Sequence, residues 1–520
     1  MIRIWFLALA VSMGLVAQRP LAKETTLRAH LSFLADDLME GRGTGARGGR
    51  LAARYLEAQL QALGLQPAQG QSFCQSVKMA GIRTLPTTHL TLSGPKGRIP
   101  FSAGTDFVAG SGALVSALNI DAPLVFVGHG ITLGGRDDFK GVDVRGKILV
   151  AMVGDRPEQA QGCCTPGHLA GRWRYKLGEA RRRGAVGILL IHDTVRAAYD
   201  WSVVQAGWVS ERFDLEPVEP GAGLQGWVSN ALAKALFSAS GLDFEALSRQ
   251  ADGLDFHPIP MAGLRIQGTV HSALRTFEDK NVVGILPGTD PVLAKEVVVY
   301  SAHWDHLGWE PTTGKIYNGA VDNASGCAGV LAIAQAVAGK PSPRSQMFFF
   351  PCGEEQGLLG AEAFVAHPLW PLEKIVAVLN LESLNFAGRT WDIGLAGSEA
   401  STLFDLAAGV AKGMGLAVVS DRPDPAGLFF RSDHFPFVKA GVPAFSPGFS
   451  LDGGWDFQEA TGAAKAKAYV VQQYHKPADR YDPGWDLRGM LQQIQFTLLL
   501  GQELCERPDR PTWKTGPQKW

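Results

Sequence analysis

The side chains best suited to catalysis are histidines and carboxylates placed directly after apolar runs. They occur after EVVVYSA (His303 and Asp305), after SQMFFFP (Glu354 and Glu355) and after KIVAVLNL (Glu382). In open α/β sheets, ligands gather at the carboxyl ends of the strands. We therefore expect three strands to deliver these side chains to one edge of a sheet, which is the strongest physical signal in the sequence.

Two further residues extend this set. Asp322, in NGAVDNASG, stands at the start of a predicted helix in the loop that follows His303, and His475, in YHKPADRYD, lies in a Pro-containing loop able to fold back. Together with His303, Glu355 and Glu382, they make five candidate ligands. Two metal ions that share one bridging carboxylate need a donor set of this kind.

Each of these residues has an ordinary structural explanation when taken alone. Asp322 fits a helix N-cap, and the pair Glu354–Glu355 fits a solvated helix start, where carboxylates favour the dipole. Likewise, Glu382 fits the polar end of a strand and His475 a loop histidine. However, two adjacent acids after a buried strand cannot both face water, so at least one must face a cation or a substrate. The joint order and placement favour the metal site.

Composition and charge limit the possible partners. The chain has 520 residues, of which 46% are apolar and 19% charged, so it can bury a large core. Lys plus Arg is 49 and Asp plus Glu is 50, giving a net charge of −1. Because no net positive field would gather a polyanion, we expect no nucleic-acid partner.

The first residues predict export. One Arg precedes a short apolar run that ends in small side chains, IRIWFLALAVSMGLVA, which is typical of a secretory signal peptide. The run is shorter than the roughly 20 residues that a spanning helix needs. We expect residues 1–22 to be a signal peptide, the mature protein to be periplasmic or secreted, and no stable membrane association after cleavage. Spacing alone assigns no disulfide to the six cysteines.

The pattern of apolar residues divides the mature chain into three parts. Residues 23–105 begin with two amphipathic helices, residues 106–262 carry short β-type runs, and residues 263–520 alternate apolar strands with helices. Such alternation predicts an α/β fold with a largely parallel mixed sheet covered by helices on both faces. The early helices have no sheet of their own, so we expect them to pack on this sheet. The mainly β segment 106–262 would then be an insertion.

Six motifs occur in order over most of residues 281–485. They are SAHWDHLG, YNGAVDNASG, PCGEEQGLLGAEAF, LNLES, RSDHFPFVKAGVPA and YHKPADRYD. In combination they resemble metallopeptidase family twenty-eight, the secreted di-zinc aminopeptidases related to glutamate carboxypeptidase and the transferrin receptor. Residues 27–63, with Glu40-Gly41-Arg42, resemble the N-terminal helices of that family. The stretch GRWRYKLGEARRRGAVGILLIHD resembles the protease-associated domain that some members carry as an insertion.

The resemblance implies a role for each motif residue. Asp322 would bridge two zinc ions, with Glu355 and His475 completing one site and His303 and Glu382 completing the other. By the same resemblance, Glu354 would be the general base.

Two further points concern this assignment. Asp305 is expected to accept the second ring N–H of His303 and so fix its tautomer. The family usually has Asp where this chain has Glu382, so the geometry or preferred ion of that site is in question.

The substrate pocket is expected to be lined by Arg431, Asp433 and His434. A buried structural salt bridge is an equal alternative for these residues. His434 is also the rival of His475 as the last ligand.

The resemblance therefore implies a metallo-exopeptidase that acts on peptides with a free N-terminus. Three alternatives remain open: a carboxypeptidase of the glutamate carboxypeptidase type, a glutaminyl cyclase, and a receptor-like scaffold without catalysis on the same fold. The ligand set argues against the scaffold, because such relatives lose it.

Overall fold

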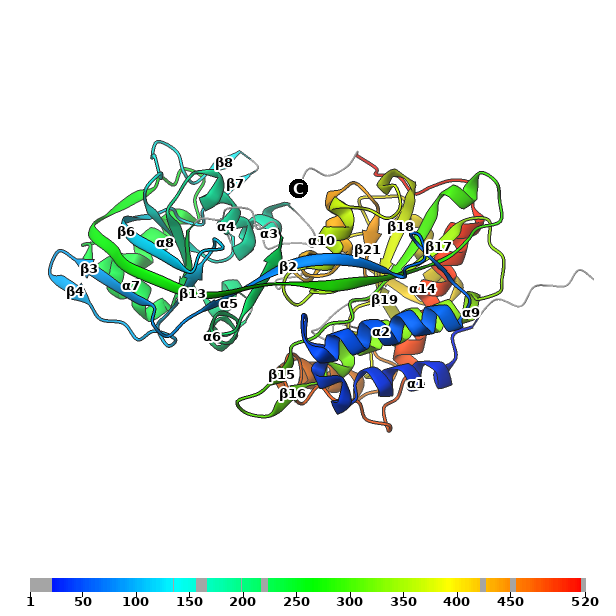
Figure 1. Ribbon diagram of the computed structural model, residues 1–520. Coiled ribbons are helices and arrows are strands. Elements are labelled where there is room, and N and C mark those ends of the chain that lie inside the picture. The colour runs from blue at the N-terminus through cyan, green and yellow to red at the C-terminus, as the bar shows by residue number, and fades with distance from the viewer. Residues whose placement is uncertain are drawn as a thin grey trace, which may run out of the picture.

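The computed structural model describes residues 21–515 except 134, 156–165, 198, 217–222, 421–426 and 449–454. Figure 1 shows two lobes joined by two long strands, β2 (Cys74–Thr84) and β13 (Ile259–Leu286). We call the lobe that contains α1, α2 and the elements from β14 to α14 the main lobe. The second lobe contains β3 to β10, β12 and α3 to α8. Nearly all of the predicted signal peptide lies outside the described residues.

The main lobe is built on a largely parallel sheet. Its strand order is β21-β18-β14-β17-β13, with β21, β18, β14 and β17 parallel and β13 antiparallel to β17. The bounds are β14 Val297–Ser301, β17 Ser345–Phe350, β18 Ile375–Asn380 and β21 Ala444–Phe445. Every residue of β14, β17 and β18 is buried, which explains why these strands read as unbroken apolar runs.

Helices cover both faces of this sheet, as the sequence predicts. One face packs against α1 (Glu24–Leu34), α2 (Arg47–Ala62), α9 (Gly326–Val337), α11 (Leu403–Gly413) and α14 (Arg488–Glu506). The other face packs against α10 (Leu359–Ala366) and α12 (His434–Lys439). Alternate strand residues serve the two cores: Val298 faces the first and Val299 the second. The predicted packing of the early helices is confirmed, because Leu27 and Leu31 are fully buried in the first core.

The second lobe continues the same sheet. From β13 the order is β6-β9-β10-β12-β5, with β6, β9, β10 and β12 parallel. The strands are β3 His89–Gly94, β4 Gly97–Ile99, β5 Phe107–Ser111, β6 Ala117–Phe126, β7 Thr132–Leu133, β8 Arg136–Asp137, β9 Ile148–Met152, β10 Gly187–Ile191 and β12 Leu224–Val228. The helices are α3 Pro166–Gly171, α4 Trp173–Arg182, α5 Thr194–Ala197, α6 Trp201–Val209, α7 Asn230–Ala239 and α8 Phe244–Ala251. Two hydrophobic cores lie on its two faces.

The predicted insertion boundaries at 106 and 262 stay a prediction, and the strand pairing shows how closely the two lobes are interwoven. β3 and β4 precede residue 106 but join the second lobe by pairing with β13 and with each other. Conversely, β11 (Arg212–Leu215) pairs with β2 beside the main lobe. The second lobe also contains the helices α3 to α8, so it has more helix than the mainly β segment predicted for residues 106–262.

Short elements complete the main lobe. They are β1 Gln66–Pro67, β15 Gly308–Glu310, β16 Lys315–Tyr317, β19 Asp392–Gly394, β20 Ala417–Val419, α13 Gly462–Gln472, and the irregular helical segments η1 Asp37–Arg42, η3 Leu293–Lys295, η4 Ala320–Ser325, η5 Leu372–Lys374 and η6 Leu428–Arg431. Among the described residues, Ala320–Val337 is the one helical stretch long and apolar enough to cross a membrane. It is 89% buried inside the protein, as a core helix is.

Candidate metal centre

The three parallel strands end at one edge of the main sheet and deliver the predicted side chains there. His303 follows β14, Glu354 follows β17 and Glu382 follows β18, and these strands are neighbours in the order β18-β14-β17. His303 Nε2 lies 3.1 Å from Glu382 Oε1 and 3.4 Å from Asp322 Oδ1. His303, Asp322 and Glu382 therefore form one buried group with the spacing of metal ligands.

A second group shares Asp322. His475 Nε2 lies 3.1 Å from Asp322 Oδ2 and 3.3 Å from Glu355 Oε2. The two carboxylate oxygens of Asp322 thus face different histidines, Oδ1 toward His303 and Oδ2 toward His475. This is the geometry of a carboxylate that bridges two neighbouring ions.

The position of Asp322 depends on a residue that the sequence analysis missed. The carboxylate of Asp479 accepts hydrogen bonds from the backbone amides of Val321 and Asp322, at 3.0 and 3.1 Å. Asp479 lies four residues after His475, so one loop supplies both a candidate ligand and the anchor of another. Its place in the motif YHKPADRYD was the available signal.

Asp305 contributes differently from the prediction. His303 Nδ1 donates to the backbone carbonyl of Asp305 at 3.0 Å, whereas the Asp305 carboxylate lies 3.8 Å away. Because a backbone carbonyl only accepts, it binds the proton on Nδ1 and holds the ring with Nε2 directed at the carboxylates. The Asp305 carboxylate instead accepts from the amides of Glu354 and Glu355 and from the hydroxyl of Thr44.

Glu354 and Glu355 are adjacent but face different groups. Glu355 Oε2 lies near His475, and His306 Nδ1 donates to Glu355 Oε1 at 2.6 Å. Glu354 Oε2 lies 3.8 Å from His303 Nε2, beyond hydrogen-bond distance. The two acids therefore diverge, with Glu355 turned into the second ligand group and Glu354 standing beside the first.

His306 is a candidate that the sequence reasoning did not place among the ligands. It lies with Asp322 and Glu355 in a group that could hold a metal ion. Its ring is fully buried, and the short contact of its Nδ1 with Glu355 Oε1 has the length of a hydrogen bond. This contact favours a role in orienting Glu355.

The electrostatics of the cluster favour bound cations. Burial, together with the charges of Glu382 and Glu355, raises the pKa of Glu354 well above its usual value. Burial opposes the protonation of His303, but Glu382 and Glu354 raise its pKa well above the usual value. Buried carboxylates in such excess repel one another unless a cation lies among them. Carboxylate oxygens and imidazole nitrogens are zinc donors, so the residues present fit two divalent ions.

The residues expected to line a substrate pocket lie close to this centre without joining either ligand group. Arg431 donates to the hydroxyl of Tyr474 at 3.2 Å. Asp433 is fully buried, and within the described part of the chain neither of its carboxylate oxygens has a hydrogen-bond partner. His434 Nδ1 accepts from Ser446 at 3.0 Å, and burial lowers its pKa to about 3. His475, rather than its rival His434, therefore lies with the ligands.

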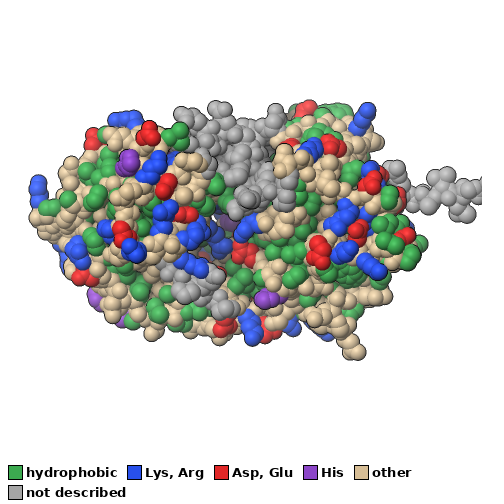
Figure 2. Space-filling model, turned by 90° about the horizontal axis from the view of Figure 1, so that it is seen from above, with side chains coloured by type: hydrophobic (Ala, Val, Ile, Leu, Met, Phe, Trp, Pro, Cys, Tyr) green, Lys and Arg blue, Asp and Glu red, His purple; other side chains and the backbone are tan. Residues whose placement is uncertain are grey.

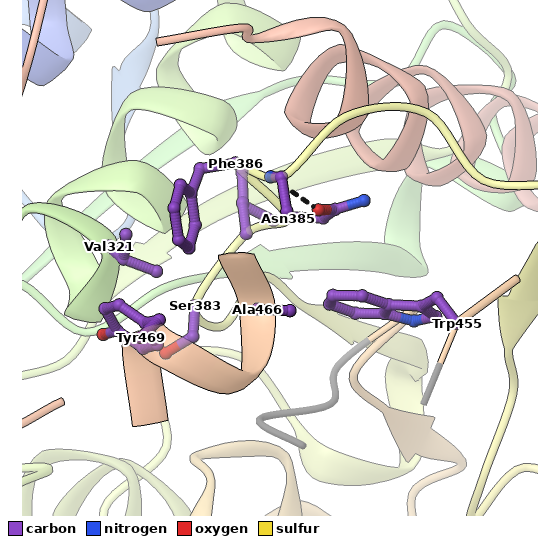
Figure 3. A pocket seen from close by; sticks show the side chains of 9 residues that line it. Val321, Ser383, Asn385, Phe386, Trp455, Ala466 and Tyr469 are labelled. Atoms are coloured by element: carbon purple, nitrogen blue, oxygen red, sulfur yellow. Dashed lines mark hydrogen bonds between the residues drawn. The ribbon is translucent and has the colours of Figure 1, made fainter. Parts of the chain in front are cut away.

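A small pocket is lined in part by sequence neighbours of Asp322 and Glu382. Arg431, Asp433 and His434 are not among its lining residues. Figure 3 shows its side chains, which come from the segments adjoining Asp322 and Glu382, from α13 and, for Trp455, from the chain before α13. Its cavity volume is only about 20 Å³, and it is lined by Val321, Ser383, Leu384, Asn385, Phe386, Ala387, Trp455, Ala466 and Tyr469. The ring of Phe386 and the indole of Trp455 make much of its wall apolar and aromatic.

The sequence matches a known peptidase family over the segment that carries the centre. The profile of Peptidase family M28 matches residues 281–499. This segment is therefore similar to peptidase family M28. This segment contains all five candidate ligands together with Glu354 and Asp479.

Curated relatives of this family segment are peptidases of different lengths. The chain is 24% identical to aminopeptidase YwaD of Bacillus subtilis over 306 residues, which are 57% of this chain and 60% of the relative. It is 32% identical to leucine aminopeptidase 1 of Trichophyton equinum over 139 residues, or 25% and 36%. With the vacuolar membrane protease of Lachancea thermotolerans it shares 35% identity over 121 residues, or 23% and 11%. The chain thus spans from 11% to 60% of the length of these relatives.

Two solved structures share the fold across both lobes. An aminopeptidase from Aneurinibacillus sp. strain AM-1 aligns with a TM-score of 0.54 at 16% identity, covering 94% of this chain and 95% of that one. BSAP, a zinc aminopeptidase from Bacillus subtilis, aligns with a TM-score of 0.50 at 18% identity, covering 95% and 98%. These structures confirm the predicted fold class.

Proposed function

We propose that this protein is a zinc-dependent aminopeptidase whose active site holds two zinc ions. The observation that carries the proposal is Asp322, whose two carboxylate oxygens face two separate histidine–carboxylate groups. The M28 profile match and the aminopeptidases among the relatives support the same activity. Export to the periplasm or the medium is part of the proposal and rests on the N-terminal sequence.

Each candidate ligand has a proposed position. We infer that Asp322 would serve both ions, that His303 and Glu382 would hold one, and that His475 and Glu355 would hold the other. When bound, the ions polarise the scissile carbonyl and lower the pKa of a bound water. Asp479 holds the backbone at Asp322, and the carbonyl of Asp305 holds the His303 ring with Nε2 available.

Glu354 is the proposed general base. Its carboxylate stands beside the His303 group and makes no hydrogen bond to that ring, so it is available to the attacking water. It takes the proton of that water and passes it to the leaving amine.

A substrate panel combined with metal analysis tests this function. The purified protein should contain close to two zinc ions per chain and should hydrolyse aminoacyl anilides, with activity lost on chelation. N-blocked peptides with a free C-terminus should not be cleaved. Cleavage of only those peptides would establish the carboxypeptidase alternative, and cyclisation of N-terminal glutamine would establish the glutaminyl cyclase. Activity that is intact in chelator, in protein without metal, would refute the proposal.

A further inference from the structure

An arginine of the second lobe contacts the loop that carries Glu354 and Glu355. Arg174 lies in the first turn of α4, and Figure 1 shows α4 in the part of the second lobe nearer the main lobe. Its Nη1 donates to the carbonyl of Gly357 at 2.8 Å, and its Nη2 donates to the carbonyl of Gln356 at 2.7 Å. One guanidinium therefore binds two consecutive carbonyls directly after the two acids.

The loop is shaped to receive this side chain. Gly357 has φ of +112°, and a Cβ at this position would lie 2.0 Å from Arg174 Nη2. The amides of Gly357 and Leu358 both donate to the carbonyl of Glu354, at 2.7 and 3.0 Å, and so close a tight turn. Only glycine permits both the backbone conformation and the close approach of the guanidinium.

The same loop is held at its other end from within the main lobe. The carboxylate of Asp305 accepts from the amides of Glu354 and Glu355, at 3.1 and 3.3 Å. An anion thus binds amides at the start of the turn, while the Arg174 cation binds carbonyls at its end. The two charges act on opposite ends of one short segment.

Further contacts bring the second lobe close to the centre. The side chain of Arg172 lies 3.4 Å from the position that a Cβ of Gly427 would occupy in the main lobe. Burial raises the pKa of Tyr199 in the second lobe, and the guanidinium groups of Arg172 and Arg431 oppose that rise. Figure 2 shows Lys and Arg side chains gathered around the hollow between the lobes.

We propose that Arg174 is a positioning residue through which the second lobe holds the Glu354–Glu355 loop in its working geometry. The inference rests on the proposed aminopeptidase function. Arg174 touches neither ligand side chain nor Glu354 itself, so its effect on the reaction passes through the backbone of the loop. The second lobe then takes part in catalysis without supplying a ligand.

The test compares Arg174→Ala with Arg182→Ala. Arg182 lies on the same helix and its ion pair with Glu179 stays within that helix, so it is a matched control. For Arg174→Ala we expect kcat on a short aminoacyl anilide to fall about tenfold, the lower end of losses for outer-sphere partners of a metal site. The KM, the zinc content and the melting temperature should stay near the wild-type values. Arg174→Lys, which retains one donor group, should recover part of the rate, and added guanidinium should partly rescue Arg174→Ala.

A measurement independent of activity separates this inference from the proposed function. Amide hydrogen exchange in a peptide covering residues 353–360 should be faster in Arg174→Ala and unchanged in Arg182→Ala, because the amides of Gly357 and Leu358 close the turn that Arg174 holds. Unchanged exchange together with unchanged kcat would overturn the inference even if the aminopeptidase activity is real. A rate loss that merely follows zinc loss or unfolding would overturn it as well. An inactive wild type whose exchange still depends on Arg174 would refute the function alone.

Discussion

Replacing Glu354 and Glu355 one at a time tests the most specific assignment in the centre, the division of roles between general base and metal ligand. Glu354→Gln keeps the size of the side chain but cannot accept a proton at neutral pH. Because Glu354 Oε2 lies 3.8 Å from His303 Nε2, the substitution breaks no hydrogen bond to that ring. Zinc content should therefore stay near that of the wild type.

The expected rate loss follows from the role of the lost group. General-base catalysis contributes about 100-fold to 10,000-fold, or about 3–5 kcal/mol of the barrier. The kcat should fall by that factor, while the KM changes little because ground-state binding does not use the proton transfer. In metal-free protein, the melting temperature should be equal or higher, because the raised pKa of Glu354 shows that its charge is disfavoured in the fold.

Glu355→Ala should behave in the opposite way. Glu355 Oε2 lies 3.3 Å from His475 Nε2, and Oε1 accepts from His306, so the truncation removes a ligand and leaves a buried histidine without its acceptor. Zinc per chain should drop toward one, with activity falling as a consequence. Stopped-assay kinetics and elemental analysis on the same samples check both variants. If Glu354→Gln loses zinc while Glu355→Ala retains it, the two roles are exchanged and the reasoning is refuted.

Three further predictions concern the supports of the centre and the second lobe. Glu382 contacts His303 at 3.1 Å and Ser432 at 2.9 Å, so the shorter side chain in Glu382→Asp should lose one of these contacts. Its zinc affinity should fall about 10- to 100-fold in chelator competition. An unchanged affinity would contradict the inference that Glu382 needs both contacts. Asp479→Asn should lower zinc affinity by a similar factor, because one of its two amide hydrogen bonds is lost, and titration with a zinc dye measures this. Burial lowers the pKa of Lys176 to about 7, so between pH 7 and 10 the unfolded chain binds more protons, and the free energy of unfolding should rise by about 1.4 kcal/mol per pH unit. Denaturant titrations of Lys176→Met should show that slope reduced, and an equal slope would refute its cause.

The sequence predicted those parts of the main lobe that are determined by the pattern of neighbouring residues, such as buried strands and amphipathic helices. Strands buried on both faces must be continuously apolar, so β14, β17 and β18 were visible, and the first polar residue after each run marks the sheet edge. The helical periodicity of Leu27 and Leu31 likewise predicted the face of α1 that packs on the sheet. The candidate ligands followed from these elements, since parallel neighbours end on the same side.

Pairing over long distances was not visible in the sequence. β13 is a single strand of 28 residues that pairs with β2 and β17 at one end and with β6 and β3 at the other. A change of composition near residue 262 therefore falls inside a continuous element. Composition indicates whether a residue is buried or exposed. It does not show that the backbone of one strand continues from one core into the next. The carbonyl of Asp305 as the partner of His303 was hidden for a related reason, because backbone acceptors leave no mark on residue type.

The contact of Arg174 could not be predicted from the sequence for both of these reasons: it is long-range and its acceptors are backbone carbonyls. It also explains how a lobe that supplies no ligand can affect the chemistry. Its partners are the carbonyls of Gln356 and Gly357, so no side-chain type at either position records the bond, and 182 residues or more separate donor from acceptor. The one trace in the sequence is the glycine that leaves room for the guanidinium. Because β2 and β13 run unbroken between the lobes, the placement of α4 is tied to the same sheet whose edge holds His303 and Glu382. A shift of the second lobe along that sheet would move the end of the Glu354–Glu355 turn while Asp305 holds its start, and the direction of the two carboxylates would change with it.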